Sequence, residues 1–160
     1  MDKYKVKVWV DGSFSIIDKK GIYGGAAIAY IGDDKTPLEC KWADSKNNMA
    51  RLRNVAGELI AVMGIVQQLS KFKDNIDSVI IFYDYDGIEK WATGEWQCRK
   101  DVTRAYANFI QPKMKELNIS FIHVKGHSGN VNNERADRLA KEAVKQYASN
   151  IQRVPDTGDR

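Results

Sequence analysis

Four acidic residues from distant parts of the chain could together bind a divalent cation: Asp11, Glu58, Asp84 and Asp137. Asp11 and Asp84 come directly after the runs KVKVWV and SVIIFY, which have the composition of buried β-strands. The other two acids fall in segments whose apolar residues have helical spacing. Because an acid at the carboxyl end of a strand lies in the crevice where open α/β sheets bind ligands, the set predicts a common site. Four carboxylates gathered there repel one another, so a cation is needed to hold them.

Each acid also has an ordinary structural explanation when it is taken singly. Glu58 could complement the helix dipole near the first turn of its helix, as glutamate often does. Asp84 could simply cap the end of its strand, and Asp86 could face the site in its place. Asp137 could lie on a solvated helix face, although it adjoins an apolar stripe. Position alone favours the ordinary explanation for Glu58 and Asp137 and leaves Asp84 undecided.

The two histidines have different settings. His127 lies in KGHSGN, a glycine-bearing loop, where an imidazole could either move protons or be an ordinary polar loop residue. His123 lies within ISFIHV, an apolar run typical of a strand, and a structural role is predicted for it.

The composition is that of one soluble globular domain. The chain has 160 residues, of which 43% are hydrophobic and 29% charged, and this length is enough to bury a core. No run approaches the roughly 18 apolar residues of a membrane span, so no membrane partner is expected. The formal net charge of +4 is compatible with a polyanionic partner but does not require one.

The cysteines and the N-terminal segment indicate where the chain works. Cys40 and Cys98 lie far apart and outside any CxxC pattern, so we expect free thiols, a reducing compartment and no zinc site. The first residues, MDKYKVKVWV, run directly into a strand, so no signal peptide is expected. Both features predict a cytoplasmic protein.

Alternating apolar residues predict a first strand over residues 5–10. Its three valines share one face, and Lys5, Lys7 and Trp9 share the other. The pair Gly12–Ser13 predicts a turn directly after this strand.

The remaining elements follow from changes in the apolar period. Strands are predicted over 23–32, 38–44, 78–83 and 119–124, and helices over 55–71, 87–93, 102–117 and 136–147. Beyond Ser149 there is no period, so we expect one domain over 1–149 and a flexible tail over 150–160. The order β-β-β-α-β-α-α-β-α favours an α/β fold with a mixed sheet and helices on both faces.

The segments around the acids resemble, in order and in predicted secondary structure, the four signature blocks of type 1 ribonuclease H. These segments are VWVDGSF, NVAGELIAV, IIFYDYDGIEKW and HVKGHSGNVNNERADRLA, and the likeness spans about 5–147. It implies a ribonuclease H-like fold: a five-stranded mixed sheet whose first three strands are antiparallel, with helices on both faces. It also implies a Mg²⁺-dependent endonuclease that cuts the RNA strand of RNA–DNA hybrids and leaves 5′-phosphate and 3′-hydroxyl ends.

The resemblance implies roles for six residues. Asp11, Glu58, Asp84 and Asp137 would bind two Mg²⁺ ions in the substrate complex, with Mn²⁺ able to substitute. Asp11 would bridge both ions, Asp137 would hold the ion that activates water, and Glu58 and Asp84 would hold the ion facing the leaving 3′-oxygen. Glu134 and His127 would assist proton movement and product release. The chemistry agrees, since Mg²⁺ prefers oxygen ligands and two ions about 3.5–4 Å apart suit an in-line displacement.

The resemblance also implies substrate contacts. Gly12 and Ser13, together with Glu58 and Asn54, match positions that read the 2′-hydroxyl group, by which a protein distinguishes RNA from DNA. The family often has two asparagines before the glutamate on the helix, whereas here only Asn54 matches. A reduced groove for the DNA strand would use Lys90, Trp91, Trp96, Arg99 and Lys100. Equally, both tryptophans could simply pack the short helix.

The chain lacks the long basic protrusion that several members carry between the third and fourth blocks. Residues 86–116 contain six Lys or Arg and five Asp or Glu, a net charge of +1. Because phosphate neutralisation drives much of nucleic-acid affinity, weak hybrid binding by a single domain is predicted.

Three functions remain in view from the sequence. The leading one is a catalytically active, hybrid-specific ribonuclease that acts as a monomer. A hybrid-binding module without catalysis is disfavoured, because such a module has no reason to keep four mutually repelling acids. A related metal nuclease with another nucleic-acid substrate, such as branched DNA, is disfavoured by the block KGHSGN…NNERADRLA.

Overall fold

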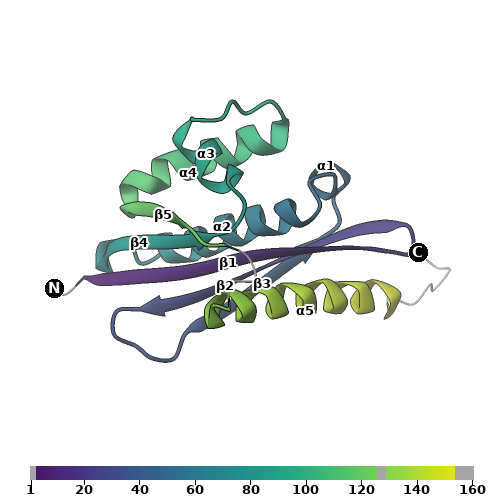
Figure 1. Ribbon diagram of the computed structural model, residues 1–160, viewed down its shortest axis with the longest axis horizontal. Coiled ribbons are helices and arrows are strands. Elements are labelled where there is room, and N and C mark those ends of the chain that lie inside the picture. The colour runs from purple at the N-terminus through teal and green to yellow at the C-terminus, as the bar shows by residue number, and fades with distance from the viewer. Residues whose placement is uncertain (1–2, 126–128, 154–160) are drawn as a thin grey trace.

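The computed structural model describes residues 3–125 and 129–153. Figure 1 shows the elements, which follow one another as β1 (Tyr4–Ile17), β2 (Lys20–Ile31), β3 (Leu38–Asp44), α1 (Asn47–Ala50), α2 (Asn54–Ser70), a 3₁₀ turn (Lys73–Asn75), β4 (Ile76–Tyr83), α3 (Gly87–Thr93), α4 (Asp101–Glu116), β5 (Ile119–His123) and α5 (Val131–Arg153). Within the described ranges, no helix is both long and apolar enough to cross a membrane.

The five strands form one mixed sheet in the order β3-β2-β1-β4-β5. Strands β1, β2 and β3 pair antiparallel, whereas β4 runs parallel to β1 and β5 runs parallel to β4. The expected α/β architecture, with its first three strands antiparallel, is confirmed. Strand β1 is central, so its residues are neighbours of both halves of the sheet.

Helices cover both faces of the sheet, with α5 on one side and α2, α3 and α4 on the other (Figure 1). The alternation of β1 explains this layering. Val6, Val8 and Val10 are buried in the main core together with residues of α2. Trp9 faces the opposite side and is buried in a smaller cluster with Ala136 of α5.

The turn predicted at Gly12–Ser13 is wrong, because β1 continues through both residues and pairs them with Gly25 and Gly24 of β2. The chain turns later, at Asp18 and Lys19, where φ is 52° and 67°. Glycine is needed at position 12 for a different reason. A Cβ there would lie 2.1 Å from the carbonyl oxygen of Asn54, so Gly12 allows α2 to approach the sheet closely.

Helix α5 extends to Arg153, past the boundary predicted at Ser149. The apolar stripe continues further than the sequence pattern indicated, since Ile151 lies beside Ile17, Ile22 and Ala148 in a shallow hollow. The last residues of the predicted tail, 154–160, lie outside the described residues.

Candidate active site

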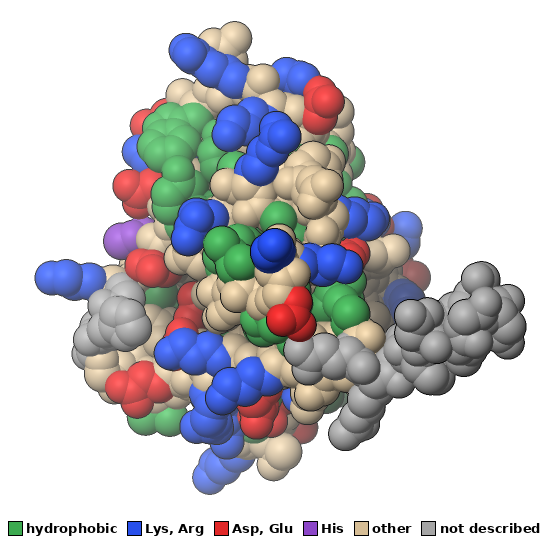
Figure 2. All heavy atoms as spheres, turned by 90° about the vertical axis from the view of Figure 1, so that its right-hand side faces the viewer, with side chains coloured by type: hydrophobic (Ala, Val, Ile, Leu, Met, Phe, Trp, Pro, Cys, Tyr) green, Lys and Arg blue, Asp and Glu red, His purple; other side chains and the backbone are tan. Residues whose placement is uncertain are grey.

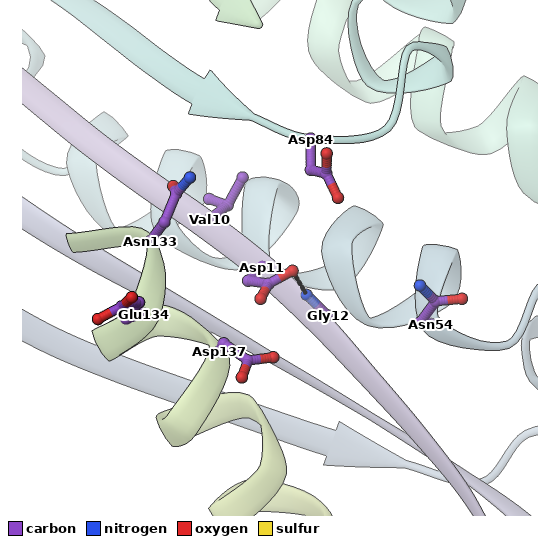
Figure 3. A pocket seen from close by; sticks show the side chains of 8 residues that line it. All are labelled: Val10, Asp11, Gly12, Asn54, Asp84, Asn133, Glu134 and Asp137. Atoms are coloured by element: carbon purple, nitrogen blue, oxygen red, sulfur yellow. Dashed lines mark hydrogen bonds between the residues drawn. The ribbon is translucent and has the colours of Figure 1, made fainter. Parts of the chain in front are cut away.

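Asp11 lies on β1 and faces α5. Its position follows from the strand's alternation, which puts residue 11 on the same face as Trp9. Its side chain is half-buried, and its Oδ1 accepts a hydrogen bond of 2.9 Å from the Gly12 backbone N–H. This contact orients the carboxylate toward α5, where Asp137 points back at it (Figure 3).

Asp137 comes from the N-terminal part of α5, beside the buried Ala136 and Ala140. Its Oδ2 lies 2.9 Å from the Nζ of Lys141, one turn further along the helix, and the Lys141 side chain is exposed. Asp137 is half-buried, with 31% of its side chain exposed, at the edge of the apolar stripe of α5.

Glu58 is the most buried of the four acids, with 4% of its surface exposed. Its carboxylate accepts hydrogen bonds from two backbone N–H groups after β4, those of Asp84 at 2.8 Å and Tyr85 at 3.3 Å. Helix α2 begins at Asn54 and has no acid in its first turn. The explanation of Glu58 as an acid near the helix start is therefore wrong. Its carboxylate instead fixes the main chain that carries Asp84.

Asp84 is the first residue after β4, and its side chain points into the same space as those of Asp11 and Asp137 (Figure 3). Its backbone is held from two sides. The N–H donates to Glu58, and the carbonyl oxygen lies 2.7 Å from Nε2 of His123 at the end of β5.

The four acids border two adjoining hollows. One, of about 130 Å³, contains Asp11, Asp84 and Asp137 in its wall, and Figure 3 shows all the lining residues, which are Val10, Asp11, Gly12, Asn54, Asp84, Asn133, Glu134 and Asp137. The other, of about 330 Å³, includes Asp11, Glu58 and Asp84 in its wall. Asp11 and Asp84 belong to both hollows, so the structure brings the predicted quartet together around one centre.

Burial and mutual repulsion perturb two of the acids. Burial raises the pKa of Asp11 to about 7; the Gly12 N–H opposes this, and the neighbouring Asp137 and Asp84 add to it. Burial also raises the pKa of Glu58 to about 8, against the hydrogen bond from the Asp84 N–H and with support from the charges of Asp11 and Asp84. Both carboxyl groups are therefore poorly compensated when ionised, which is the condition that a bound cation relieves.

The donor set fits a hard divalent cation. All four groups are carboxylates, and Mg²⁺ is usually held by a few carboxylates, several waters and substrate phosphate rather than by a complete protein cage. Within residues 3–125 and 129–153, no group of three or more His, Cys, Asp or Glu side chains is already placed to hold a metal ion.

The other site residues predicted from the sequence are distributed unevenly. Gly12 and Glu134 line the smaller hollow, and Asn54 lines both hollows. Ser13 lies one position further along β1, in neither wall. His127 lies outside the described residues.

The set predicted for the DNA strand divides in two. Trp96 lines the larger hollow, whereas Trp91 packs against the main core. Their rings lie 5.9 Å apart, and Lys90 Nζ is 5.9 Å from the Trp96 ring and 3.6 Å from Glu95. Arg99 and Lys100 are exposed and line neither hollow.

His123 is a site residue that sequence reasoning missed, since a structural role within its strand was predicted. It is exposed and lines the larger hollow, with Nε2 3.5 Å from Asp86 Oδ1. Asp86 lines the same wall. The signal was available, because β5 runs parallel to β4 and its last residue must end at the same sheet edge as Asp84.

Comparison of the sequence with known proteins assigns the chain to a protein family. The model of the RNase H family matches residues 3–145, which include all four acids. The chain belongs to the ribonuclease H family. Among curated relatives, the chain is 30% identical over 150 residues to the ribonuclease H of Hyphomonas neptunium, an alignment that covers 89% of this chain and 94% of the relative. Membership supports a nuclease, a hydrolase of nucleic acid, in a family that uses a divalent metal.

Solved structures show the same fold. RNase H1 of the archaeon Halobacterium salinarum superposes with a TM-score of 0.65 at 21% identity, over 89% of this chain and 98% of that chain. LC11-RNase H1 in complex with an RNA/DNA hybrid gives a TM-score of 0.68 at 18% identity, with the same coverage of 89% and 98%.

Proposed function

We propose that the protein is an endoribonuclease that hydrolyses the RNA strand of RNA–DNA hybrids. The observation that carries the proposal is the meeting of Asp11, Glu58, Asp84 and Asp137 around one centre in a chain of the ribonuclease H family. Water would add to phosphorus while the bond to the 3′-oxygen breaks and that oxygen takes a proton. The products carry a 5′-phosphate and a 3′-hydroxyl group.

The four carboxylates would hold two Mg²⁺ ions in the substrate complex, with Mn²⁺ as a substitute. When bound, the ions stabilise the charge that develops on the attacking and leaving oxygens. Asp11 would contact both ions, with Asp137 on one side of it and Glu58 and Asp84 on the other. The arrangement of the hollows supports this division, because Asp137 lines only the smaller one and Glu58 only the larger one.

The remaining residues would handle the substrate. Gly12, Ser13 and Asn54 would read the 2′-hydroxyl group, and Gly12 and Asn54 do border the carboxylates. Glu134 lies one turn before Asp137 at the same hollow. Glu134 and His127 would assist proton movement and product release. Trp96, beside the larger hollow, is the residue of the predicted DNA-strand set with the best placement for a base or sugar contact.

We further infer a monomer that acts in the cytoplasm. All four acids come from one chain, so no second copy is needed to complete the site. Both cysteines are free thiols, as suits a reducing compartment.

A cleavage assay with matched substrates tests the proposal. Labelled RNA–DNA hybrid, double-stranded RNA and single-stranded RNA are each incubated with Mg²⁺ and with EDTA. We expect cleavage of the hybrid alone, only with metal, in its RNA strand. Equal cutting of all three substrates, or cutting in EDTA, would contradict the proposal. Metal-independent binding of the hybrid without cleavage would instead indicate a hybrid-binding module without catalysis.

Asp84→Asn and Asp77→Asn form a matched pair for this assay. Both aspartates belong to the region of β4, but Asp77 lies exposed at the opposite end of the strand from the hollows. We expect Asp84→Asn to lower hybrid cleavage by at least about a thousandfold, in the range that loss of a directly acting group costs, while Asp77→Asn retains wild-type activity. Similar activities in the two variants would exclude Asp84 from the site.

A further inference from the structure

Toward the N-terminus of β1, the face that carries Asp11 presents Trp9 and then two lysines, Lys7 and Lys5. Trp9, Lys7 and Lys5 follow Asp11 at two-residue steps, which places consecutive side chains roughly 6.6–6.8 Å apart on one face. Lys5 and Lys7 are exposed. Helix α5 begins only partway along β1, so this helix does not cover the N-terminal part of the strand (Figure 1).

A broad groove of about 1180 Å³ lies over this part of the sheet. Lys3, Lys5 and Lys7 line one part of it, and Tyr30 and Asn132 line another. The Tyr30 hydroxyl donates a hydrogen bond of 2.9 Å to Asn132 Oδ1, which ties the first turn of α5 to β2 at the edge of the groove.

The groove adjoins the carboxylate hollow across that first turn. Asn132 lines the groove, while the next two residues, Asn133 and Glu134, line the smaller hollow that contains Asp11 and Asp137. A nucleic acid held at the carboxylates therefore has a second hollow directly beside it, around the N-terminus of α5.

The charge in the groove is available to an anion. Within residues 3–125 and 129–153, none of the three lysines forms an ion pair with an acidic side chain. Asp33 and Asp34 also line the groove, and Asp34 Oδ1 accepts the Thr36 N–H at 3.1 Å. The three lysines exceed these two acids by one positive charge.

Two other parts of the described surface are less favourable. Residues 86–116 carry six basic and five acidic side chains. On the end of the molecule seen in Figure 2, Lys and Arg side chains are spread among acidic ones rather than gathered in one patch. Since neutralised phosphates supply much of nucleic-acid affinity, Lys3 and the two lysines of β1, Lys5 and Lys7, are well placed to neutralise phosphates near the site.

We propose that Lys3, Lys5 and Lys7 form a second nucleic-acid contact, which binds backbone phosphates of the hybrid outside the carboxylate hollow. This inference rests on the proposed function, since it names where the same substrate is held. These three lysines would supply phosphate contacts of the kind that the long basic protrusion supplies in other family members.

Salt-dependent binding tests the inference separately from cleavage. Affinity for a labelled hybrid is measured by fluorescence anisotropy in EDTA over a series of salt concentrations, for the wild-type protein and for Lys5→Gln/Lys7→Gln. Each lost phosphate contact lowers the slope of log affinity against log salt by roughly 0.9, so the double variant should lose roughly 2 from the slope. Glutamine keeps a long side chain, and thermal melting confirms that the variants fold.

Lys20→Gln/Lys145→Gln is the matched control, because both lysines are exposed and lie away from the groove. It removes the same charge, and we expect it to lower the slope by less than half as much. The loss in Lys5→Gln/Lys7→Gln should also be larger for a long hybrid than for a short one confined to the carboxylate hollow. Equal slopes for the two double variants, or an equal loss with both hybrids, would overturn the inference. Absence of hybrid cleavage by the wild-type protein in Mg²⁺ would instead refute the proposed function.

Discussion

At the scale of single residues, the site depends on how the main chain after β4 is held. Glu58 accepts the N–H groups of Asp84 and Tyr85, and His123 lies on the other side of the same peptide, 2.7 Å from the Asp84 carbonyl oxygen. A carbonyl oxygen only accepts hydrogen bonds, so Nε2 of His123 must carry a proton in this arrangement. The position of the Asp84 carboxylate thus depends on two side chains that reach it from α2 and β5.

Replacement of His123 tests this dependence. In His123→Phe the ring still packs edge-on against Tyr83, as the imidazole does at 5.4 Å, but the hydrogen bond is lost. A bond of about 1 kcal/mol predicts a roughly fivefold fall in kcat with little change in KM, and His123→Gln should recover part of the loss. Steady-state kinetics on hybrid measure both values.

Ser120→Ala controls for changes in β5 itself, since Ser120 is exposed on the same strand. Calorimetric titration with Mn²⁺ in the absence of hybrid adds a readout that does not depend on turnover. Weaker Mn²⁺ binding by His123→Phe than by Ser120→Ala is expected. Unchanged binding and unchanged kcat would remove His123 from the positioning of Asp84.

At the scale of elements, glycines set the distance between α2 and the sheet. A Cβ on Gly57 would lie 1.9 Å from the Gly24 carbonyl oxygen, and one on Gly25 would lie 2.0 Å from the Gly57 carbonyl oxygen. These contacts involve backbone on both sides, so neither element can relieve them by a side-chain rotation. The close approach seats Glu58, the next residue of α2, beneath the end of β4.

Gly57→Ala should therefore destabilise the fold although alanine favours helices. Overpacking costs typically 1–3 kcal/mol, and here the clash is with backbone, so we expect a loss of at least about 2 kcal/mol in the free energy of unfolding. Gly64→Ala is the control on the same helix, because its Cβ would meet only the ring of Trp42, a side chain. Denaturant unfolding measures both variants, and an equal or smaller loss in Gly57→Ala would contradict the prediction.

At the scale of the whole molecule, the carboxylate centre links stability to pH. The pKa of Asp11 rises from 3.8 to about 7, and that of Glu58 from 4.5 to about 8, mainly through burial. Between these values the folded protein retains protons that the unfolded chain has released. The free energy of unfolding must therefore fall as pH rises through this window.

The expected outcome in EDTA is that this contribution to stability is complete below about pH 4 and is lost progressively up to about pH 8. Asp11→Asn should flatten this dependence, whereas Asp77→Asn should not. Excess Mg²⁺ should also reduce it, since the ion favours the ionised carboxylates. Denaturant titrations at several pH values measure the free energy of unfolding. If Asp11→Asn kept the wild-type dependence of this free energy on pH, other groups would be its cause.

Much of the fold could be predicted from the sequence, because the spacing of apolar residues along the chain indicates strands and helices. The alternation of Val6, Val8 and Val10 predicted a strand. The spacing of apolar residues predicted both ends of α2 and of α4 to within one residue. Glycine was ambiguous, because the same residue suits a turn and a close approach. The Gly12–Ser13 pair was therefore taken for a turn, whereas it lies inside β1.

The sequence by itself predicted which acids would gather in one place, since the blocks around Asp11, Glu58, Asp84 and Asp137 resemble those of one family, to which the chain belongs. Only the tertiary structure decided what surrounds them. In the folded protein, Glu58 is buried and accepts a hydrogen bond from the Asp84 N–H, and His123 lies beside the Asp84 carbonyl oxygen. Lys5 and Lys7 of β1 line a groove beside the carboxylate hollow. The physical reason is separation along the chain. A period depends on neighbours a few residues apart, but these contacts join β1, α2, β4 and β5, and they exist only once the sheet and helices have packed.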